Sequence, residues 1–383
     1  MEECPDRNPE VVMLKNLKYV LWIVLFVIAI GITVGYFGGF FQREGVIVPH
    51  ISPTASGSPP IISTHQFLFE QALVTISIPV NRSVYEGARG ADKSVAIFGN
   101  ISEQVWIADS YLAMARDSAQ EELYLSLITE FRKLKDEMKL TDDEYLELMT
   151  AYTQSFTYET VTENPAKFPI ETVVDASGDC DDKSLLLAGL LSHEGYRVAL
   201  LSFGPESHMA VGAGSDDYRY KNTDYAFIET TNFSFVGIPT GSLGDGVMLQ
   251  SDPIVIPIGS GSKNYTQGGQ TRFINDMNNL SGQKAKELEP QVRGMDQDLI
   301  SRREGITRLE ERMMNLKTSG NIGGYNALVP EHNALVSEYN TRLNDYRGLR
   351  ARYEQYASVY NYIISHGYDR KGVYDYVKRN MPS

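Results

Sequence analysis

Three residues with side chains suited to nucleophilic catalysis occur along the chain in the order Cys180, His208 and Glu229. In acyl transfer a thiolate attacks a carbonyl, an imidazole takes and returns the proton, and a carboxylate orients the imidazole. The sequence therefore predicts these three roles in that order. Order alone does not decide, because a buried cysteine also behaves as a small apolar residue, and strand-end histidines and glutamates commonly form only ordinary hydrogen bonds.

The residues around Cys180 indicate the start of a helix. Gly178-Asp179 interrupts the preceding extended segment, so the helix begins at or next to the cysteine. A helix start favours the thiolate through its unpaired N–H groups and dipole, whereas the three neighbouring aspartates oppose it. The apolar run 185–191 predicts a buried helix, which Gly195 ends.

Short apolar runs after this helix predict strands at 198–203, 209–213 and 225–228. His208 immediately precedes the second strand, and Glu229 immediately follows the third. The sequence therefore predicts that strand ends carry the base and the carboxylate.

Other patterns predict the elements that frame this region. Alternation over 67–78 predicts a strand, and 253–257 predicts a last strand. Apolar spacing over 101–139 predicts a long helical region, broken near Asp117-Ser118. A capping box at 141–144 (Thr-Asp-Asp-Glu) opens a further helix in front of the cysteine.

Several motifs over residues 156–239 resemble the transglutaminase-like superfamily of cysteine enzymes, of the membrane-anchored prokaryotic or archaeal type. They are Pro169-x-Glu171-Thr172, Gly178-Asp-Cys-Asp-Asp-Lys-Ser with its following leucines, Gly195-Tyr196, His208-Met-Ala-Val-Gly, Glu229-Thr-Thr and a final Val-Gly-Ile-Pro. The resemblance implies an α+β fold with a papain-like core, in which the cysteine helix packs against an antiparallel sheet. It also implies Cys180 as nucleophile, His208 as base and Glu229 as third member.

Other residues compete for two of these roles. The family most often has aspartate as the third member, so Asp224 and Asp217 stay as weaker candidates. Gln154 is a candidate oxyanion donor because papain-like enzymes use an upstream glutamine, although its spacing to the cysteine differs. His193 lies thirteen residues beyond Cys180 on the same helix, about 20 Å away, and cannot reach the thiol.

Composition excludes several classes of function. The formal net charge of −14 argues against binding nucleic acid, which needs a basic face. Only Cys4 and Cys180 are present, so a disulfide framework is excluded. Because no His/Cys spacing resembles a zinc site and no glycine-rich loop resembles a nucleotide cradle, we expect no metal and no cofactor.

Residues 19–42 contain no charged side chain. As a helix these 24 residues would extend about 36 Å, against about 30 Å for the hydrocarbon core of a bilayer. They are therefore predicted to form a transmembrane helix. Because Lys15 and Lys18 precede the run, the tail 1–18 is expected in the cytoplasm and the remainder outside the cell membrane.

Beyond the predicted span, the chain divides into a proline-rich linker at 43–66, a transglutaminase-like domain at 67–262 and a helical region at 270–383. An external location would make five sequons candidate glycosylation sites: Asn81, Asn100, Asn232, Asn264 and Asn279.

Apolar residues at heptad-like spacing on both sides of 321–324 (Asn-Ile-Gly-Gly) predict an antiparallel coiled-coil hairpin. Pro290 is expected to kink or start the first helix, and Pro330 to lie in the first turn of the second. Tyrosines along the second helix suggest a helix-mediated partner or self-association, beside the simpler interpretation of a self-contained hairpin.

We therefore expect a membrane-anchored cysteine enzyme that acts on protein or peptide substrates at peptide or carboxamide bonds, with hydrolysis as the default outcome. One alternative is a non-enzymatic surface protein that uses the domain for binding and the hairpin for assembly. Another is a structural tether in which Cys180 is inert.

The predicted orientation can be tested on intact cells. Protease added outside should remove the chain after about residue 43, because the charge bias places everything beyond the span outside. Complete protection of the segment around Cys180 would reverse the orientation.

Overall fold

The computed structural model describes residues 18–33, 44–55, 57–159, 165–239 and 248–381. The chain forms two compact units, one made of Met1–Pro49 with Asp92–Ala113 and one of His50–Ala91 with Met114–Ser383. Helices and antiparallel strands are both present, so the predicted α+β class is confirmed.

The first unit contains a helix at residues 18–33 and a two-stranded ribbon of β1 (Gly45–Ile47) and β4 (Ala96–Phe98). It also holds most of α3 (Glu103–Ala115). The predicted transmembrane helix at 19–42 is not found in that form: among the described residues, no helix is both long and apolar enough to cross a membrane. Residues 34–42, and Cys4 with the rest of 1–17, lie outside the described residues.

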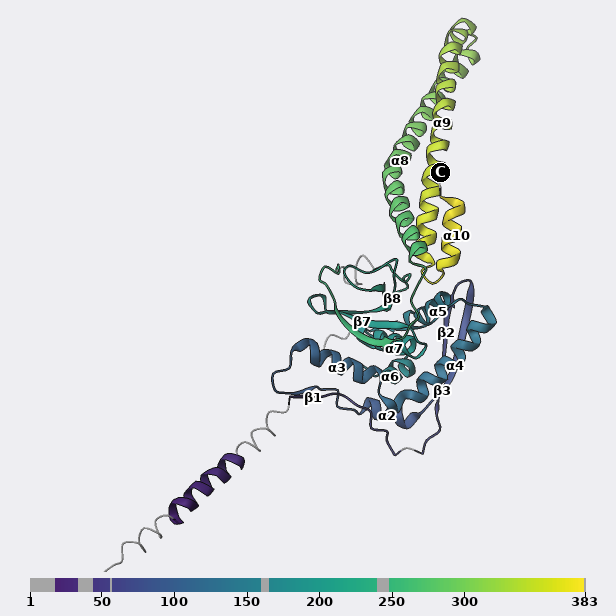
Figure 1. Cartoon of the computed structure of the whole chain (residues 1–383). Coiled ribbons are helices and arrows are strands. Elements are labelled where there is room, and N and C mark those ends of the chain that lie inside the picture. Colours follow the sequence, from purple (N-terminus) through teal and green to yellow (C-terminus); the bar gives the residue numbers. More distant parts are fainter. Residues whose placement is uncertain (1–17, 34–43, 56, 160–164, 240–247, 382–383) are drawn as a thin grey trace, which may run out of the picture. The chain divides into compact units, whose positions relative to one another are not determined.

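The second unit is built on a four-stranded antiparallel sheet in the order β10-β7-β8-β9. Its strands are β7 (Arg197–Phe203), β8 (His208–Gly214), β9 (Tyr225–Ile228) and β10 (Ile254–Ser260). These confirm the four strands predicted around and after the cysteine helix. Helix α7 (Cys180–His193) packs against β7, β8 and β10, and Figure 1 shows it next to β7.

Local sequence explains where α7 begins and ends. The Asp179 carboxylate accepts hydrogen bonds from the N–H groups of Asp181 and Asp182, so it caps the helix. Gly178 is needed there because a Cβ atom would lie 2.6 Å from the Cβ of Asp182. At the other end Gly195 has φ +79°, which favours glycine and ends the helix.

Among the described residues, α4 (Glu121–Met138), α5 (Asp142–Gln154) and α6 (Pro169–Asp175) are the last three helices before α7 in the chain. Helix α4 follows a short turn, η1 (Ser118–Gln120), which confirms the predicted break near residue 117. Helix α5 begins with the predicted capping box of Thr141 and Glu144. Helix α6 lies where we expected extended chain; Pro169 suits a first helical position, and the Glu171 carboxylate accepts from the Phe168 N–H.

The prediction of a single strand at 67–78 is wrong. Two strands, β2 (Ile61–Phe69) and β3 (Ala72–Val80), form an antiparallel hairpin there, followed by α2 (Arg82–Arg89). The turn contains Glu70 with φ 50° rather than a glycine or asparagine, so no typical turn signal marked it. A short parallel pair, β5 (Thr157–Tyr158) with β6 (Ser177–Gly178), lies directly before the cysteine helix.

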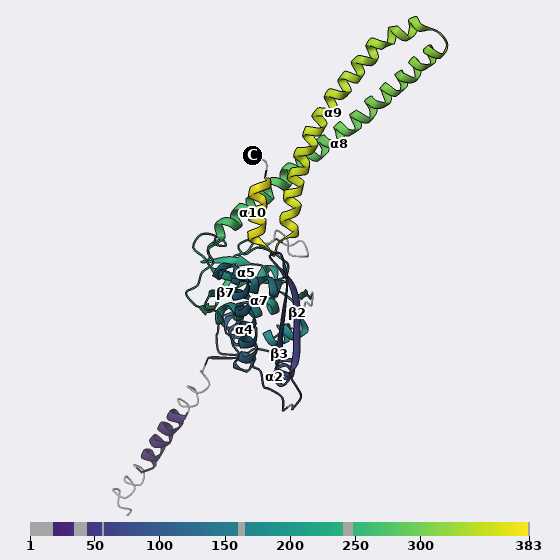
Figure 2. The ribbon, with the colours of Figure 1, turned by 90° about the vertical axis from the view of Figure 1, so that its right-hand side faces the viewer.

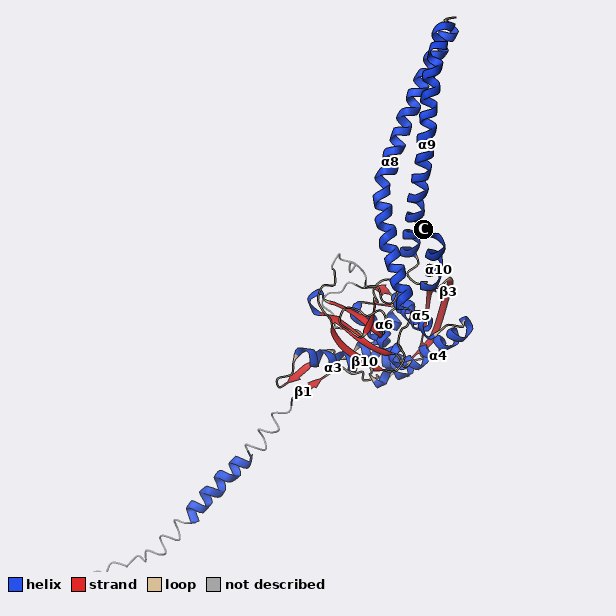
Figure 3. Cartoon of the chain, turned by 45° about the horizontal axis from the view of Figure 1, so that its top comes forward, coloured by secondary structure: helices blue, strands red, loops and turns tan. Residues whose placement is uncertain are grey.

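The C-terminal region is the predicted antiparallel hairpin, made of α8 (Gly268–Thr318) and α9 (Ile322–Ser365) and followed by α10 (Arg370–Asn380). Figures 2 and 3 show α8 and α9 extending together as a helical pair. Pro290 lies inside α8, so it does not start the helix. Pro330 lies inside α9 rather than in its first turn, because α9 already begins at Ile322 after the glycine turn.

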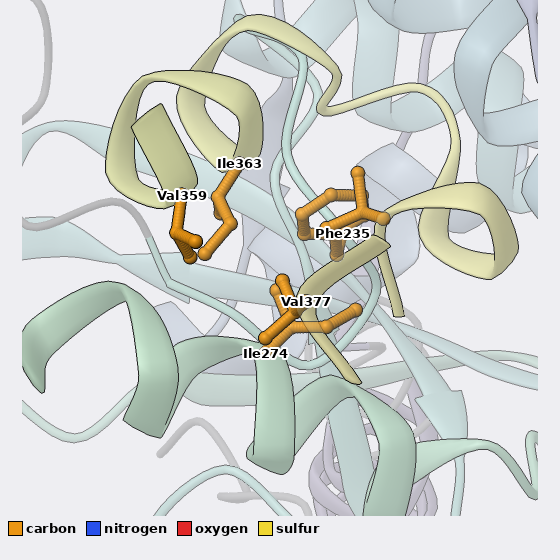
Figure 4. Packing of buried hydrophobic residues seen from close by; sticks show 6 residues of the cluster. Phe235, Ile274, Val359, Ile363 and Val377 are labelled. Carbon is orange, nitrogen blue, oxygen red and sulfur yellow. The ribbon is translucent and has the colours of Figure 1, made fainter. Parts of the chain in front are cut away.

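A shared core joins this helical region to the segment after β9. Phe235, close behind Glu229 in the chain, packs with residues of α8, α9 and α10: Ile274, Val359, Ile363, Val373 and Val377 (Figure 4). The separate folding of 67–262 and 270–383 stays a prediction, and separation of the two would expose this core.

A buried ion pair reinforces the same contact. The Arg370 guanidinium at the start of α10 pairs with Glu147 of α5, and Arg370 has only 4% of its side chain exposed. The Tyr265 hydroxyl donates to the same carboxylate. Breaking such a buried pair leaves an uncompensated charge in the interior.

We expect Arg370→Leu to lower the free energy of unfolding by about 3–5 kcal/mol, because Glu147 would remain buried without its cation. The matched control is Arg293→Leu, which breaks the exposed pair with Glu289 on α8 and should cost less than about 0.5 kcal/mol. Urea unfolding of both variants measures the difference. Equal losses would show that the buried pair does not hold α10 to α5.

Candidate functional site

The Cys180 thiol lies against the first residues of β8. Its sulfur is 4.0 Å from the carbonyl oxygen of Ser207 and also accepts a hydrogen bond from the Met209 N–H. These two residues flank His208 in the chain. The fold thus brings the first residue of α7 to the point where β8 begins.

The His208 imidazole is buried and contacts the carboxylate of Glu229. Its Nε2 lies 3.2 Å from Glu229 Oε2. Because an ionised carboxylate only accepts, Nε2 carries the proton in the neutral ring and Nδ1 is left as an acceptor. Among the described residues Nδ1 has no hydrogen-bond partner, so this nitrogen is available to take a proton.

Glu229 is completely buried, yet it has enough partners to stay ionised. Its Oε1 accepts from the N–H of Thr230 and from the N–H and hydroxyl of Thr231, at 2.8–3.0 Å. Burial alone would raise the pKa of Glu229, but the contact with His208, followed by the bonds from Thr231, holds the pKa below its usual value. The carboxylate is therefore charged at neutral pH.

The pKa of the Cys180 thiol is raised, although a helix start by itself would lower it. Burial, followed by the negative charge of Asp181, raises the pKa of Cys180 well above its ordinary value. The Asp181 carboxylate lies 3.5 Å from the sulfur, and Asp179 adds to the effect. Of the two opposing effects expected at this helix start, the neighbouring aspartates, together with burial, outweigh the helix dipole.

The competing candidates lie in other surroundings. Asp224 forms an ion pair with Arg219, and Asp217 accepts from Ser215 and from the Gly269 N–H. His193 contacts Gly189 and Glu121. The partner of His208 in the structure is Glu229.

Gln154 is placed close to the site but is used differently from an oxyanion donor. Its amide nitrogen donates to the carbonyl oxygens of Glu229, at 2.7 Å, and of Ser234, at 3.0 Å. Both of its amide protons are therefore engaged. The side chain holds the backbone of the acidic residue instead of facing the thiol.

Sequence reasoning missed three residues that build this site. Lys183, one turn after Cys180, is fully buried and donates to three backbone carbonyls. Thr231 binds Glu229, and Asp182 accepts from the N–H groups of Lys167 and Asp179. The signal that could have indicated Lys183 and Asp182 was a charged lysine and aspartate in the first turn of a helix whose later residues are apolar.

One group among the described residues has ligand atoms close enough to hold a metal ion. The oxygens and sulfur of Asp179, Cys180 and Asp181 lie within 4.8 Å of one another. The Asp179 carboxylate already accepts the two N–H groups at the start of α7, so the structure gives it a capping role.

Comparison of the chain with protein-family models, with curated proteins and with solved structures found no match.

The buried Asp182 generates a pH prediction. Burial, followed by the charge of Asp179, raises the pKa of Asp182 from 3.8 to about 7. The folded protein then keeps a proton that the unfolded chain has lost, so this group's contribution to stability is complete below about pH 4 and falls as the pH rises to about 7. Between pH 5 and 7.5, wild type should lose about 2–3 kcal/mol relative to Asp182→Asn in urea unfolding.

The control for this measurement is Asp345→Asn, at an exposed position on α9, which should follow the wild-type pH dependence. Parallel stability curves for wild type and Asp182→Asn would contradict the raised pKa.

Proposed function

We propose that the protein is a transglutaminase-like cysteine enzyme that cleaves peptide or carboxamide bonds by acyl transfer. The observation that carries the proposal is the arrangement around His208. The imidazole Nε2 contacts the charged Glu229, and the backbone of the residues before and after His208 contacts the Cys180 sulfur. Such chemistry needs a nucleophile, a base and an orienting group close together, and the contacts of the sulfur with the residues on either side of His208 support that placement.

In the proposed reaction, Cys180 attacks the substrate carbonyl as its proton passes to His208 Nδ1, forming a carbon–sulfur bond. The carbon–nitrogen bond then breaks, and the imidazolium returns the proton to the leaving amine. Water then attacks the thioester carbonyl as it gives a proton to His208, forming a carbon–oxygen bond. The carbon–sulfur bond breaks, the imidazolium returns the proton to the sulfur, and the carboxylic acid leaves. Because the resting thiol is protonated, transfer to His208 accompanies attack rather than preceding it.

The developing oxyanion needs donors near the sulfur. Cys180 is the first residue of α7, so its N–H has no acceptor within the helix. The Asp179 carboxylate binds the next two N–H groups and leaves this one. We assign the oxyanion donor role to the Cys180 N–H in place of Gln154.

The proposed setting is the outer face of a cell membrane, with the N-terminus in the cytoplasm. The uncharged run at 19–42 and the lysines before it support this placement. Proteins or peptides are the proposed substrates, and the α8–α9 hairpin is the proposed surface for a helical partner or self-association.

A second candidate is a binding protein that does not use the thiol. The observation in its favour is that Cys180 has only 7% of its surface exposed and a raised pKa. Such a protein would retain the fold but show no dependence of thiol reactivity on His208.

The test is the alkylation rate of Cys180 by iodoacetamide at pH 7, followed by mass spectrometry of its own peptide. His208→Ala should lower the rate at least tenfold, because general-base assistance is typically worth about 10²–10⁴. Glu229→Gln should lower the rate in the same direction while the fold is retained, because the imidazole loses its charged partner. Asp224→Asn is the control and should match wild type.

A Cys180 whose rate is unchanged by His208→Ala would overturn the enzymatic proposal and leave the binding protein.

A further inference from the structure

The fully buried Lys183 is the charged group that the proposed reaction leaves without a role. It lies on α7 three residues after Cys180, and its side chain has no exposed surface. The ammonium donates to the carbonyl oxygens of Phe156 at 2.9 Å, Gln154 at 3.2 Å and Thr231 at 3.5 Å. An ammonium has three protons, so all three are used.

Two of these carbonyls belong to the end of α5. The last carbonyls of a helix have no intrahelical donor, and in a buried position they need another partner. Gln154 is the last residue of α5, and Phe156 follows just beyond it. Lys183 thus supplies the donor that the end of α5 lacks, and it ties this end to the cysteine helix.

Two of these three contacts reach residues that also bind Glu229. Thr231 offers its carbonyl to Lys183, while its N–H and hydroxyl donate to Glu229 Oε1. Gln154 offers its carbonyl to Lys183, while its amide donates to the backbone carbonyl of Glu229. A single side chain therefore connects the helix of the thiol to Thr231, which binds the Glu229 carboxylate, and to Gln154, which binds the Glu229 backbone.

We infer that Lys183 is a positioning residue that fixes Glu229, and through it the His208 imidazole, relative to Cys180 by holding Gln154 and Thr231. The inference rests on the proposed function, since it assigns Lys183 a part in that same site. The positive charge of Lys183 is part of this role, because the ammonium supplies all three donors. Burial lowers the pKa of Lys183 to about 8, while the nearby Glu229 opposes this shift, so the ammonium is the main form at pH 7.

A double-mutant cycle on the full-length chain tests this role, with the Cys180 alkylation rate at pH 7 as the readout. In the wild-type background His208→Ala should slow alkylation about tenfold or more. Lys183→Met keeps an unbranched side chain that is one heavy atom shorter and removes the donors. In this background the same change should slow alkylation less than about threefold, because the imidazole is already displaced. Each rate is measured well below the melting temperature of its variant.

The matched control is Leu191→Ala on the same helix. Leu191 is fully buried and lies eleven residues beyond Cys180, about 16 Å along the helix, so its loss destabilises α7 without touching the site. In this background the full effect of His208→Ala should remain. A role of Lys183 in stability alone would make Lys183→Met behave like Leu191→Ala.

Each outcome has a distinct meaning. If His208→Ala has no effect even in the wild-type background, the proposed function fails. If the effect is present in wild type and fully retained with Lys183→Met, the positioning role is overturned. Should Lys183→Met not fold, Lys183→Gln enters the same cycle, because its shorter amide has only two protons and cannot make all three contacts. A fully retained effect would again overturn the role.

Discussion

The site depends on keeping a charged carboxylate inside the protein. Glu229 has no exposed surface, and an unpaired carboxylate in such a place would be protonated rather than charged. Its two oxygens are held by His208, Thr230 and Thr231, and these bonds outweigh the cost of burial. Charge on Glu229 in turn decides which nitrogen of His208 carries the proton. The state of the base is therefore set by backbone and hydroxyl donors of the Glu229-Thr-Thr segment.

The buried surroundings favour the neutral form of the Cys180 thiol, although Glu229 stays charged in them. Glu229 has several donors, whereas Cys180 has the Met209 N–H and lies beside the Asp181 carboxylate, so its charged form is disfavoured. The thiol at rest is consequently neutral. For an enzyme of this kind, charge separation arises only when the carbonyl is attacked, and the start of α7 then contributes most to the oxyanion rather than to a preformed thiolate.

The sequence predicted an element correctly where a local pattern is typical of one kind of structure only. The cap at Asp179, the glycine at 195 and the apolar strands on either side of His208 each predicted an element that the structure contains. Prediction from the sequence failed where the conformation or the role of a residue depends on its tertiary environment. The β2–β3 turn at Glu70 has no typical turn residue, and Pro330 is accommodated inside α9. Gln154 had the residue type of an oxyanion donor, but only its neighbours show that Glu229 and Ser234 take both amide protons.

The segment that follows Glu229 connects the site to the helical region. Thr230 and Thr231 bind the carboxylate, and four residues after Thr231 the side chain of Phe235 enters the core shared with α8, α9 and α10. Full burial of such a side chain is worth about 2–3 kcal/mol, comparable to the cost of leaving a buried polar group unpaired. Packing against the C-terminal helices thus helps to hold the backbone whose N–H groups keep Glu229 charged. Glu229, the two threonines that donate to it and Phe235 thus follow one another within seven residues. Through Phe235, the C-terminal helices help to support the site.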